Sequence, residues 1–357
     1  MDLKNQNVLF FTRATQHGGT ENVILQLCEI FHPVVNKIVV ASASGFAVEK
    51  LHHYGIKHYS IPDIESKSLS TVITVLKIIK RIVEDEHITV IHTHHRMAAF
   101  YCQLIPHKEL ILINTSHTVF YNKKYLTQFA FKKMNLIACG KTVKESLVEY
   151  QGIIQERIKV IPNAIKPFTR NISIIKEINE YKKEGYVAAG VIGRLSYEKG
   201  VINLVEAAKE LKDLKIRFFI VGSGDEEVTI RTRIAAYGLN DYFVFLGYRS
   251  DAQNVAAQLD FLILPSLQEG LPLVPIEAFS VSTPVLATDV GGTKEVVVDG
   301  YNGILIEADN EKALCKAIRK MTSIDLAEYR DNAYRTYIDK FSYELFAKKY
   351  LDYYKGL

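Results

Sequence analysis

The sequence predicts an α/β protein built from two doubly wound, Rossmann-like domains in tandem. Its 357 residues are enough for two domains of ordinary size. Short β-type runs alternate with helical patterns, which favours parallel sheets covered by helices on both faces. This alternation stops near residue 165 and starts again near residue 185. We therefore expect two domains, 1–165 and 185–339, with a cleft between them.

The first predicted domain, 1–165, contains six apolar runs of strand length and three segments of helical character. Strands are expected at Asn7–Phe11, Lys37–Ala41, His58–Ile61, Thr89–His92, Leu110–Asn114 and Leu136–Ala138. Helices are expected at Gly19–Phe31, Ser70–Glu84 and Lys141–Glu149.

The second predicted domain, 185–339, repeats the same alternation. Strands are expected at Val187–Ile192, Arg217–Val221, Val244–Leu246, Phe261–Leu264, Pro284–Ala287 and Gly303–Ile306, and helices at Val201–Leu211 and Asp225–Tyr237. The stretch Lys166–Glu184 is polar and lacks a strong apolar period, so we place the domain boundary there. A last helix, Tyr343–Lys355 within the terminal segment 340–357, is apolar on one face.

Charge is distributed unevenly along the chain. Residues 1–160 hold 19 Lys and Arg against 13 Asp and Glu, a net of +6, whereas the remainder holds 25 against 27, a net of −2. We expect the basic first half to be the part that meets an anionic surface. The four cysteines are scattered, and no apolar run approaches the roughly 20 residues needed to span a bilayer. These features predict a cytoplasmic protein with reduced thiols.

Glu269 and Glu277 are the most informative pair of residues. Glu269 follows a predicted buried strand that Pro265 ends, and Gly270 permits a sharp turn before a helix. Glu277 is expected about two turns into that helix. Ligands bind at the carboxyl ends of parallel strands, and a helix start attracts phosphate. Two carboxylates beside an anion site suit a nucleotide sugar. The alternative is a solvated loop glutamate and a helix-surface glutamate.

A second loop, Gly193–Gly200, follows the first strand of the second domain. It places Arg194 and Lys199 five residues apart between glycines. A diphosphate requires cationic donors that stay charged, and both residues meet this requirement. The alternative is a surface loop with two ordinary cations. No metal-binding Asp-x-Asp motif lies in a suitable loop, so we expect neither a metal nor another cofactor.

Glycines and histidines mark predicted strand ends in the first domain. Gly18 and Gly19 precede a helix, where glycine lets a ligand approach the backbone; the alternative is a plain turn. His117 follows the strand Leu110–Asn114 and is either a ligand contact or a hydrogen-bonded loop residue. His92, His94 and His95 suggest zinc. The two histidines that are two positions apart on the strand point to one face, but no third convergent ligand is evident. We expect these three histidines to line the acceptor side.

The segment Tyr121–Lys133 interleaves aromatic residues with paired lysines. A basic amphipathic helix of this kind suits an anionic membrane surface. Similar patterns occur in nucleic-acid binders, but we expect no nucleic-acid partner. The alternative is an ordinary surface helix whose aromatic residues belong to the core.

Together these motifs resemble the retaining glycosyltransferases of the GT-B fold, most closely glycosyltransferase family 4. The spacing of Glu269 and Glu277 matches the E-x7-E signature of that group. The resemblance extends over nearly the whole chain, through Gly18–Glu21, Ile161–Asn163, Gly193–Gly200, Val221–Gly224, Leu246–Gly247, Pro265–Ser266 and Gly291–Glu295. It implies a retaining hexosyltransferase whose donor is a nucleotide sugar, more often a UDP-sugar. It also implies that the last helix packs on the first domain.

The resemblance assigns a role to each candidate residue. Glu269 would orient the transferred sugar, Glu277 would hold the ribose hydroxyls, and His117 would contact the sugar near its reacting carbon. Further roles follow for groups around the donor: Arg194 and Lys199 on the pyrophosphate, Gly18 or Gly19 on a donor phosphate, Tyr248 near the nucleobase, and Gly270, Leu271 and Leu273 elsewhere in the donor site.

The resemblance also implies an acceptor and two rival functions. The acceptor would be a polyprenyl-diphosphate-linked glycan or another sugar of a surface polysaccharide, which fits a peripheral protein at the inner face of a membrane. One rival is an enzyme resembling UDP-N-acetylglucosamine 2-epimerase, which shares the two-domain architecture. The other is a non-catalytic module that binds nucleotide sugars. The donor sugar, the linkage and the oligomeric state are open at this point.

Overall fold

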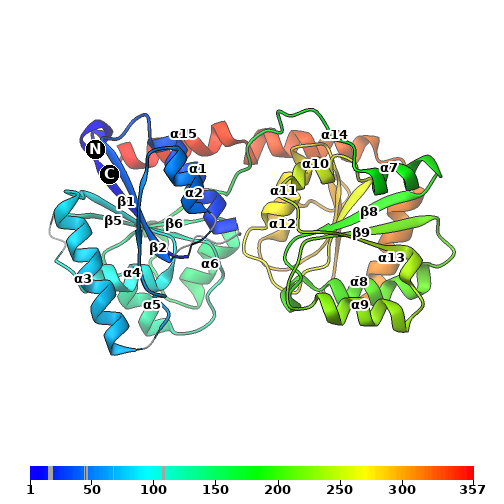
Figure 1. Cartoon of the computed structure of the whole chain (residues 1–357), viewed down its shortest axis with the longest axis horizontal. Helices are drawn as coiled ribbons and strands as arrows, with labels where there is room; N and C mark the ends of the chain where they lie inside the picture. The colour runs from blue at the N-terminus through cyan, green and yellow to red at the C-terminus, as the bar shows by residue number, and fades with distance from the viewer. Residues whose placement is uncertain (15–18, 44, 46, 67, 107–108) are drawn as a thin grey trace. The chain divides into compact units, whose positions relative to one another are not determined.

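The protein folds into two compact units. The computed structural model describes residues 1–14, 19–43, 45, 47–66, 68–106 and 109–357. Unit 1 comprises Met1–Asn163 together with Glu344–Leu357, and unit 2 comprises Ala164–Tyr343. Each unit contains one sheet with helices on both faces, as Figure 1 shows.

The sheet of unit 1 has seven strands, all parallel, in the order β3-β2-β1-β4-β5-β6-β7. The strands are β1 (Asn7–Ala14), β2 (Lys37–Ala43), β3 (Lys57–Ser60), β4 (Val90–Thr93), β5 (Ile111–Ser116), β6 (Asn135–Ala138) and β7 (Ile158–Val160). The chain therefore adds strands on one side of β1 and then returns to add the others beyond β4.

The helices of unit 1 cover both faces of this sheet (Figure 1). They are α1 (Gly19–Phe31), α2 (Ala47–His53), α3 (Leu69–Asp85), α4 (Arg96–Gln103), α5 (Lys124–Ala130), α6 (Lys141–Glu149) and α15 (Tyr343–Lys355). The last helix, α15, packs beside α1, where the rings of Phe31 and Tyr354 lie 4.3 Å apart. Within the described ranges, no helix combines the length and apolar character needed to cross a bilayer.

Unit 2 repeats this topology with six parallel strands in the order β10-β9-β8-β11-β12-β13. The strands are β8 (Val187–Ile192), β9 (Ile216–Val221), β10 (Phe243–Gly247), β11 (Phe261–Leu264), β12 (Val285–Thr288) and β13 (Gly303–Ile306). The helices are α7 (Lys176–Lys183), α8 (Val201–Ala208), α9 (Glu227–Ala236), α10 (Ala252–Ala256), α11 (Leu273–Phe279), α12 (Thr293–Val296), α13 (Glu311–Ser323) and α14 (Ala327–Thr336).

The predicted fold class is confirmed, and every predicted strand and helix is present with ends shifted by a few residues. The sequence prediction omitted strand β7, most of the shorter helices and the longer helices α13 and α14. One omission is α7, inside the polar stretch Lys166–Glu184, where the helix buries only Ile178. This stretch belongs to unit 2: the backbone N–H of Ser173 donates to Asn254 Oδ1 at 2.8 Å, and that of Ile175 donates to Gln258 Oε1 at 2.8 Å.

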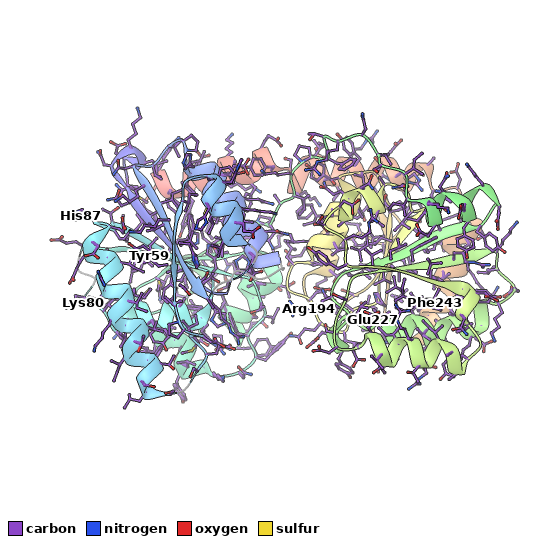
Figure 2. All side chains as sticks on the ribbon, viewed as in Figure 1. Tyr59, Lys80, His87, Arg194, Glu227 and Phe243 are labelled. Carbon is purple, nitrogen blue, oxygen red and sulfur yellow. The ribbon has the colours of Figure 1, made fainter. Side chains whose placement is uncertain are left out.

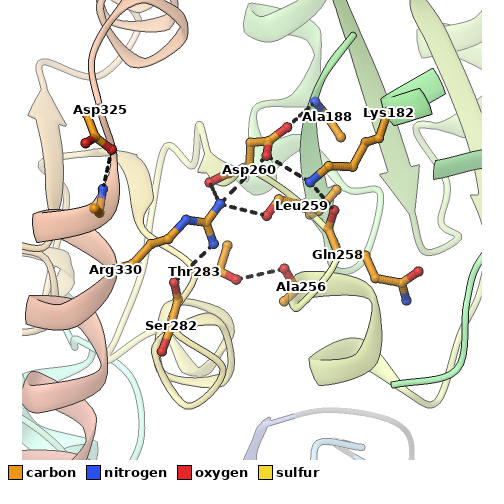
Figure 3. Close-up of polar contacts among 11 residues, drawn as sticks. Lys182, Ala188, Ala256, Gln258, Leu259, Asp260, Ser282, Thr283, Asp325 and Arg330 are labelled. Atoms are coloured by element: carbon orange, nitrogen blue, oxygen red, sulfur yellow. Dashed lines mark hydrogen bonds and ion pairs between the residues drawn. The ribbon is translucent and has the colours of Figure 1, made fainter. Parts of the chain in front are cut away.

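Polar contacts join the amino ends of the strands in unit 2, and Figure 3 shows them around Asp260. The Asp260 carboxylate accepts from the backbone N–H of Ala188 at 2.8 Å and from Lys182 Nζ at 2.8 Å. The Arg330 guanidinium donates to the Asp260 carbonyl at 2.9 Å. One residue thus holds together β8, β11, α7 and α14.

In unit 1, Glu86 joins several elements, as Asp260 does in unit 2. Its carboxylate, 10% exposed, accepts from Lys57 Nζ at 2.7 Å, from Lys37 Nζ at 2.9 Å and from the Tyr59 hydroxyl. The hydrogen bonds from Lys57, then Tyr59 and Lys37, lower the pKa of Glu86 to about 2. Lys37 and Lys57 begin β2 and β3, so the buried carboxylate fixes two strand starts.

At the carboxyl ends of the unit 2 strands, loops contact each other through their backbones. Gly291, in the loop after β12, has φ of +53°, and a Cβ there would lie 1.9 Å from the Glu269 carbonyl oxygen. The backbone N–H of Gly292 donates to the Gly270 carbonyl at 2.7 Å. The loop after β11 is therefore braced by a neighbour that has no side chain at the point of contact.

We predict that Glu86→Gln lowers the free energy of unfolding of unit 1 by about 1–2 kcal/mol at pH 7. The lowered pKa alone corresponds to about 3 kcal/mol, which we reduce because the two lysines are 40% and 60% exposed. A carboxyl whose folded pKa is lowered stabilises above its unfolded pKa, so the difference from wild type should vanish as the pH falls from about 4.5 to about 2. Denaturant unfolding across this range measures it.

The control for this variant is Glu84→Gln, because the Glu84 carboxylate forms an exposed pair with Lys80 at 3.8 Å. It should change the free energy of unfolding by less than about 0.5 kcal/mol. Equal effects of the two substitutions at pH 7 would contradict the role of Glu86.

We also predict that Gly291→Ala destabilises unit 2 by about 2 kcal/mol more than Gly300→Ala. Both glycines have positive φ, but a Cβ at Gly300 would meet no atom within 4 Å. Backbone strain alone costs about 1 kcal/mol, whereas at Gly291 the Glu269 loop must also move. Thermal melting of the two variants measures the difference, and equal melting temperatures would show that the close approach carries no energy.

Candidate functional site

The candidate site in unit 2 lies where the strand order reverses. Strands β8 and β11 are adjacent, but α8 and α11, which follow them, cover opposite faces of the sheet (Figure 1). The two loops at the carboxyl ends of β8 and β11 must therefore diverge, which is the usual place for a ligand in such sheets. Arg194 and Lys199 lie in one of these loops, and Glu269 lies in the other.

The structure brings Lys199 and Glu269 into direct contact. Lys199 Nζ donates to Glu269 Oε1 at 2.7 Å, and the Ser266 hydroxyl donates to the same oxygen at 2.7 Å. Glu269 is 9% exposed, whereas the Lys199 side chain is 29% exposed. The buried carboxylate is thus neutralised by a lysine that still reaches solvent. A lysine ammonium has three donor hydrogens, so Lys199 can hold Glu269 and an anion together.

Arg194 lies on the loop that follows β8, where Figure 2 labels it. Its side chain is exposed and makes no hydrogen bond or ion pair with the part of the chain that the structure describes. It is therefore a cation whose five N–H donors are available to a ligand.

Glu277 lies on α11, nearer to the helix start than expected. It is the fifth residue of α11, about one turn in, because the helix begins only at Leu273, after Pro272 as the capping residue. Desolvation raises the pKa of Glu277 to about 7. Its charge therefore changes near neutral pH. Pro275 lies in the first turn, and its missing N–H leaves that turn with one donor fewer for an anion.

The remaining residues proposed for the donor site fall in two places. Gly270, Leu271 and Leu273 follow Glu269 directly and lead into α11; Leu271 is buried. Tyr248 is half-exposed on the loop after the edge strand β10, with β9 between that strand and β8. The first group therefore shares a loop with Glu269. Tyr248 belongs to a different loop, which also follows the carboxyl end of a strand.

The carboxyl edge of the unit 1 sheet carries a pair of histidines. His94 follows β4 and His117 follows the neighbouring strand β5. His94 Nδ1 lies 3.0 Å from His117 Nε2, and the two rings are inclined by only 17°. Desolvation lowers the pKa of His117 to about 4 and holds that of His94 well below its usual value, which favours neutral rings at pH 7.

Both histidines line a cavity of about 130 Å³ within unit 1. Its walls are formed by Thr20, His94, His95, Arg96, Asn114, Thr115, Ser116, His117, Thr118 and Phe120. A cavity with hydroxyl, amide and imidazole groups suits a small, hydroxyl-rich ligand group.

His94 and His95 both line this cavity, whereas His92 does not, and their place on the acceptor side stays a prediction. His92 is fully buried between Tyr354 and Thr115, with 2.8 Å contacts to both hydroxyls, and does not line the cavity. His95 caps α4 by accepting from the backbone N–H of Met97 at 3.2 Å. Within the described ranges, no three histidine, cysteine or acidic side chains are grouped to hold a metal ion.

Gly18 lies outside the described residues, and Gly19 is the first residue of α1. Sequence reasoning missed two contacts of the site. It gave no role to Ser266, which bonds Glu269 from three residues upstream, and it did not pair His94 with His117. The strand-end position of both histidines was the available signal, because the carboxyl ends of parallel strands meet at one edge.

Two family models match most of the chain. The model of glycosyltransferase family 4 matches residues 17–167, and the model of glycosyl transferases group 1 matches residues 173–337. The boundary between the two matches falls close to the boundary between the two structural units.

Curated relatives and a solved structure agree with these matches. A glycosyltransferase of Methanocaldococcus jannaschii is 29% identical over 80% of this chain and 81% of its own length. The UDP-Gal:alpha-D-GlcNAc-diphosphoundecaprenol alpha-1,3-galactosyltransferase of Escherichia coli is 24% identical over 72% of this chain and 71% of its own length. The Anabaena Alr3699/HepE structure, in complex with UDP-glucose, superposes with a TM-score of 0.84 and 18% identity, covering 99% of this chain and all of that one.

The tandem Rossmann-like units, the paired Lys199 and Glu269 at a strand-order reversal and the family matches lead to one conclusion: this chain has the GT-B fold and belongs to glycosyltransferase family 4.

Proposed function

We propose that this protein is a retaining hexosyltransferase that moves a sugar from a UDP-sugar to a lipid-linked glycan in the biosynthesis of a surface polysaccharide. The observation that carries the proposal is the Lys199–Glu269 pair. It places a buried carboxylate, which can accept from sugar hydroxyls, within 2.7 Å of a cation that can bind a diphosphate. A donor that contains both groups would satisfy both residues.

In the proposed reaction the acceptor hydroxyl attacks the anomeric carbon from the face that the diphosphate leaves. The new bond joins the acceptor oxygen to that carbon, and the bond from the carbon to the phosphate oxygen breaks. The leaving phosphate oxygen takes the hydroxyl proton, so the products are a glycoside and UDP. Lys199 and Arg194 would stabilise the negative charge that develops on the diphosphate.

The other candidate residues would complete the donor site. Glu277 would accept from the ribose hydroxyls and Tyr248 would contact the nucleobase. From unit 1, His117 would contact the transferred sugar, and Gly18 or Gly19 would approach a donor phosphate. The loop residues Gly270, Leu271 and Leu273 would line the donor site beside Glu269.

The comparisons support the choice of donor and acceptor. The Escherichia coli relative carries UDP-galactose and a diphosphoundecaprenol-linked acceptor in its name, and the Anabaena structure contains UDP-glucose. A UDP-sugar 2-epimerase or a silent binding module would share the fold. Detection of sugar on an acceptor, rather than an isomerised or unchanged donor, separates the proposal from both.

We predict that Glu269→Gln lowers sugar turnover by about two orders of magnitude or more, as expected when a contact at the reacting centre is lost. The affinity for free UDP should change little, because the substitution leaves Arg194 and Lys199 in place to bind the diphosphate. Product formation from a panel of UDP-sugars measures the first effect, and titration calorimetry with UDP measures the second.

Glu328→Gln is the control, because Glu328 is exposed on α14, away from the strand ends that carry the site. It should leave both quantities unchanged. Near-normal turnover in Glu269→Gln would remove this residue from the site.

The proposed membrane surface lies on Tyr121–Lys133 of unit 1. The helix there, α5, has seven residues and is shorter than the amphipathic helix expected. The aromatic residues of the segment Tyr121–Lys133 differ in exposure: Phe131 is fully buried, but Tyr125 is 87% exposed and Tyr121 is 61% exposed. Lys123, Lys124, Lys132 and Lys133 are exposed in the same segment. Exposed aromatic rings beside lysines favour contact with an anionic lipid surface over an ordinary solvated helix.

We predict that the protein pellets with vesicles containing anionic lipid at low salt and is released at high salt. Changing Lys123, Lys124, Lys132 and Lys133 together to glutamine should abolish pelleting. The matched control changes four exposed lysines of unit 2, Lys183, Lys312, Lys316 and Lys320, and should still pellet. Equal pelleting by both fourfold variants would show that the segment is not the membrane surface.

A further inference from the structure

The buried histidines of unit 1 form a continuous row that the proposed reaction does not yet use. His92 and His94 are two residues apart on one strand end, with ring centroids 4.4 Å apart. Phe10 packs against both rings, at 5.5 Å and 5.9 Å. Behind them, the Tyr354 and Thr115 hydroxyls hold both nitrogens of His92. His94 is therefore fixed in position before it contacts His117.

The contact between His94 and His117 is an in-plane hydrogen bond. The nitrogens lie 3.0 Å apart and the ring planes differ by 17°, which aligns an N–H of one ring with the lone pair of the other. Because both rings are neutral, each carries one proton, and only one of the two facing nitrogens can donate.

The second nitrogen of His94 decides which ring donates. His94 Nε2 is buried and has no hydrogen-bond partner among the residues that the structure describes. Buried N–H donors are left without an acceptor more rarely than acceptors are left without a donor. This preference favours a proton on His94 Nδ1, so that Nδ1–H would donate to His117 Nε2.

This arrangement fixes the role of Nδ1, the second ring nitrogen of His117. With Nε2 accepting from His94, the single proton of His117 is on Nδ1. His117 is among the residues that line the cavity, so its Nδ1–H would be a neutral donor for an oxygen acceptor there. A histidine that was free to rotate or change tautomer would present donor and acceptor in turn.

We infer that His94 is a positioning residue, which holds the ring of His117 in one orientation and one tautomer so that His117 donates Nδ1–H to an oxygen of the transferred sugar or its phosphate. This inference rests on the proposed function for the identity of the ligand. The geometry of the pair does not depend on it.

The first test reads the tautomer directly. Nitrogen NMR of protein labelled at histidine, with His117 assigned from a His117→Gln variant, should show its proton on Nδ1 at pH 7. In His94→Phe, which keeps a flat ring against His92 and Phe10 but cannot donate, His117 should show a mixture of tautomers. A proton on His117 Nε2 in the wild type, or an unchanged tautomer in His94→Phe, would overturn the inference.

The second test reads the consequence for transfer. In His94→Phe, kcat should fall about tenfold, as expected for the loss of one hydrogen bond that positions a contact, while UDP affinity, which depends on unit 2, stays unchanged. His94→Asn should restore most of kcat, because its amide can donate from nearly the position of Nδ1. In the His117→Ala background, His94→Phe should add no further loss.

Full turnover in His94→Phe, or no rescue by His94→Asn despite an equal melting temperature, would show that the hydrogen bond does not matter. The NMR test needs neither donor nor acceptor. A protein with the expected tautomer but without transferase activity would therefore contradict the proposed function alone.

Discussion

In each unit the strand order reverses between two neighbouring strands, β1 and β4 in one and β8 and β11 in the other. A right-handed connection forces the helices that follow such a pair onto opposite faces. The loops between strand and helix then separate, and backbone groups at that point are not covered by a neighbouring helix. The polar residues of both candidate regions lie at these points: Lys199 and Glu269 in unit 2, and His94 in unit 1.

The amino and carboxyl ends of the strands have different kinds of polar contacts. At the amino ends, single carboxylates tie several elements together: Glu86 joins β2 and β3, and Asp260 joins β8 with α7. Both carboxylates are occupied by protein donors. At the carboxyl ends, Arg194 is exposed and the buried His94 Nε2 has no partner among the described residues. Stability and ligand chemistry are therefore assigned to opposite ends of the same strands.

Fold class followed from sequence because parallel strands buried on both faces are continuous apolar runs, which is a strong local signal. Helix α7 was missed because it buries a single residue, Ile178, in a stretch that is otherwise polar. The positions of Glu269 and Lys199 at strand ends were predictable, but their mutual contact was not, because it depends on how two loops 70 residues apart pack. The same reason hid the pairing of His94 with His117, since each residue alone is an ordinary strand-end histidine.

The hydroxyl of Tyr354 reaches His92 across 262 positions of sequence, and Tyr350 reaches Thr115 across 235. During synthesis on the ribosome, all of unit 2 emerges between these partners. Unit 1 therefore cannot complete its core when its own strands appear, and it must wait as a partly covered sheet while unit 2 is made. Until α15 arrives, His92 lacks its contact with the Tyr354 hydroxyl, and the arrival of this last helix completes the core of unit 1.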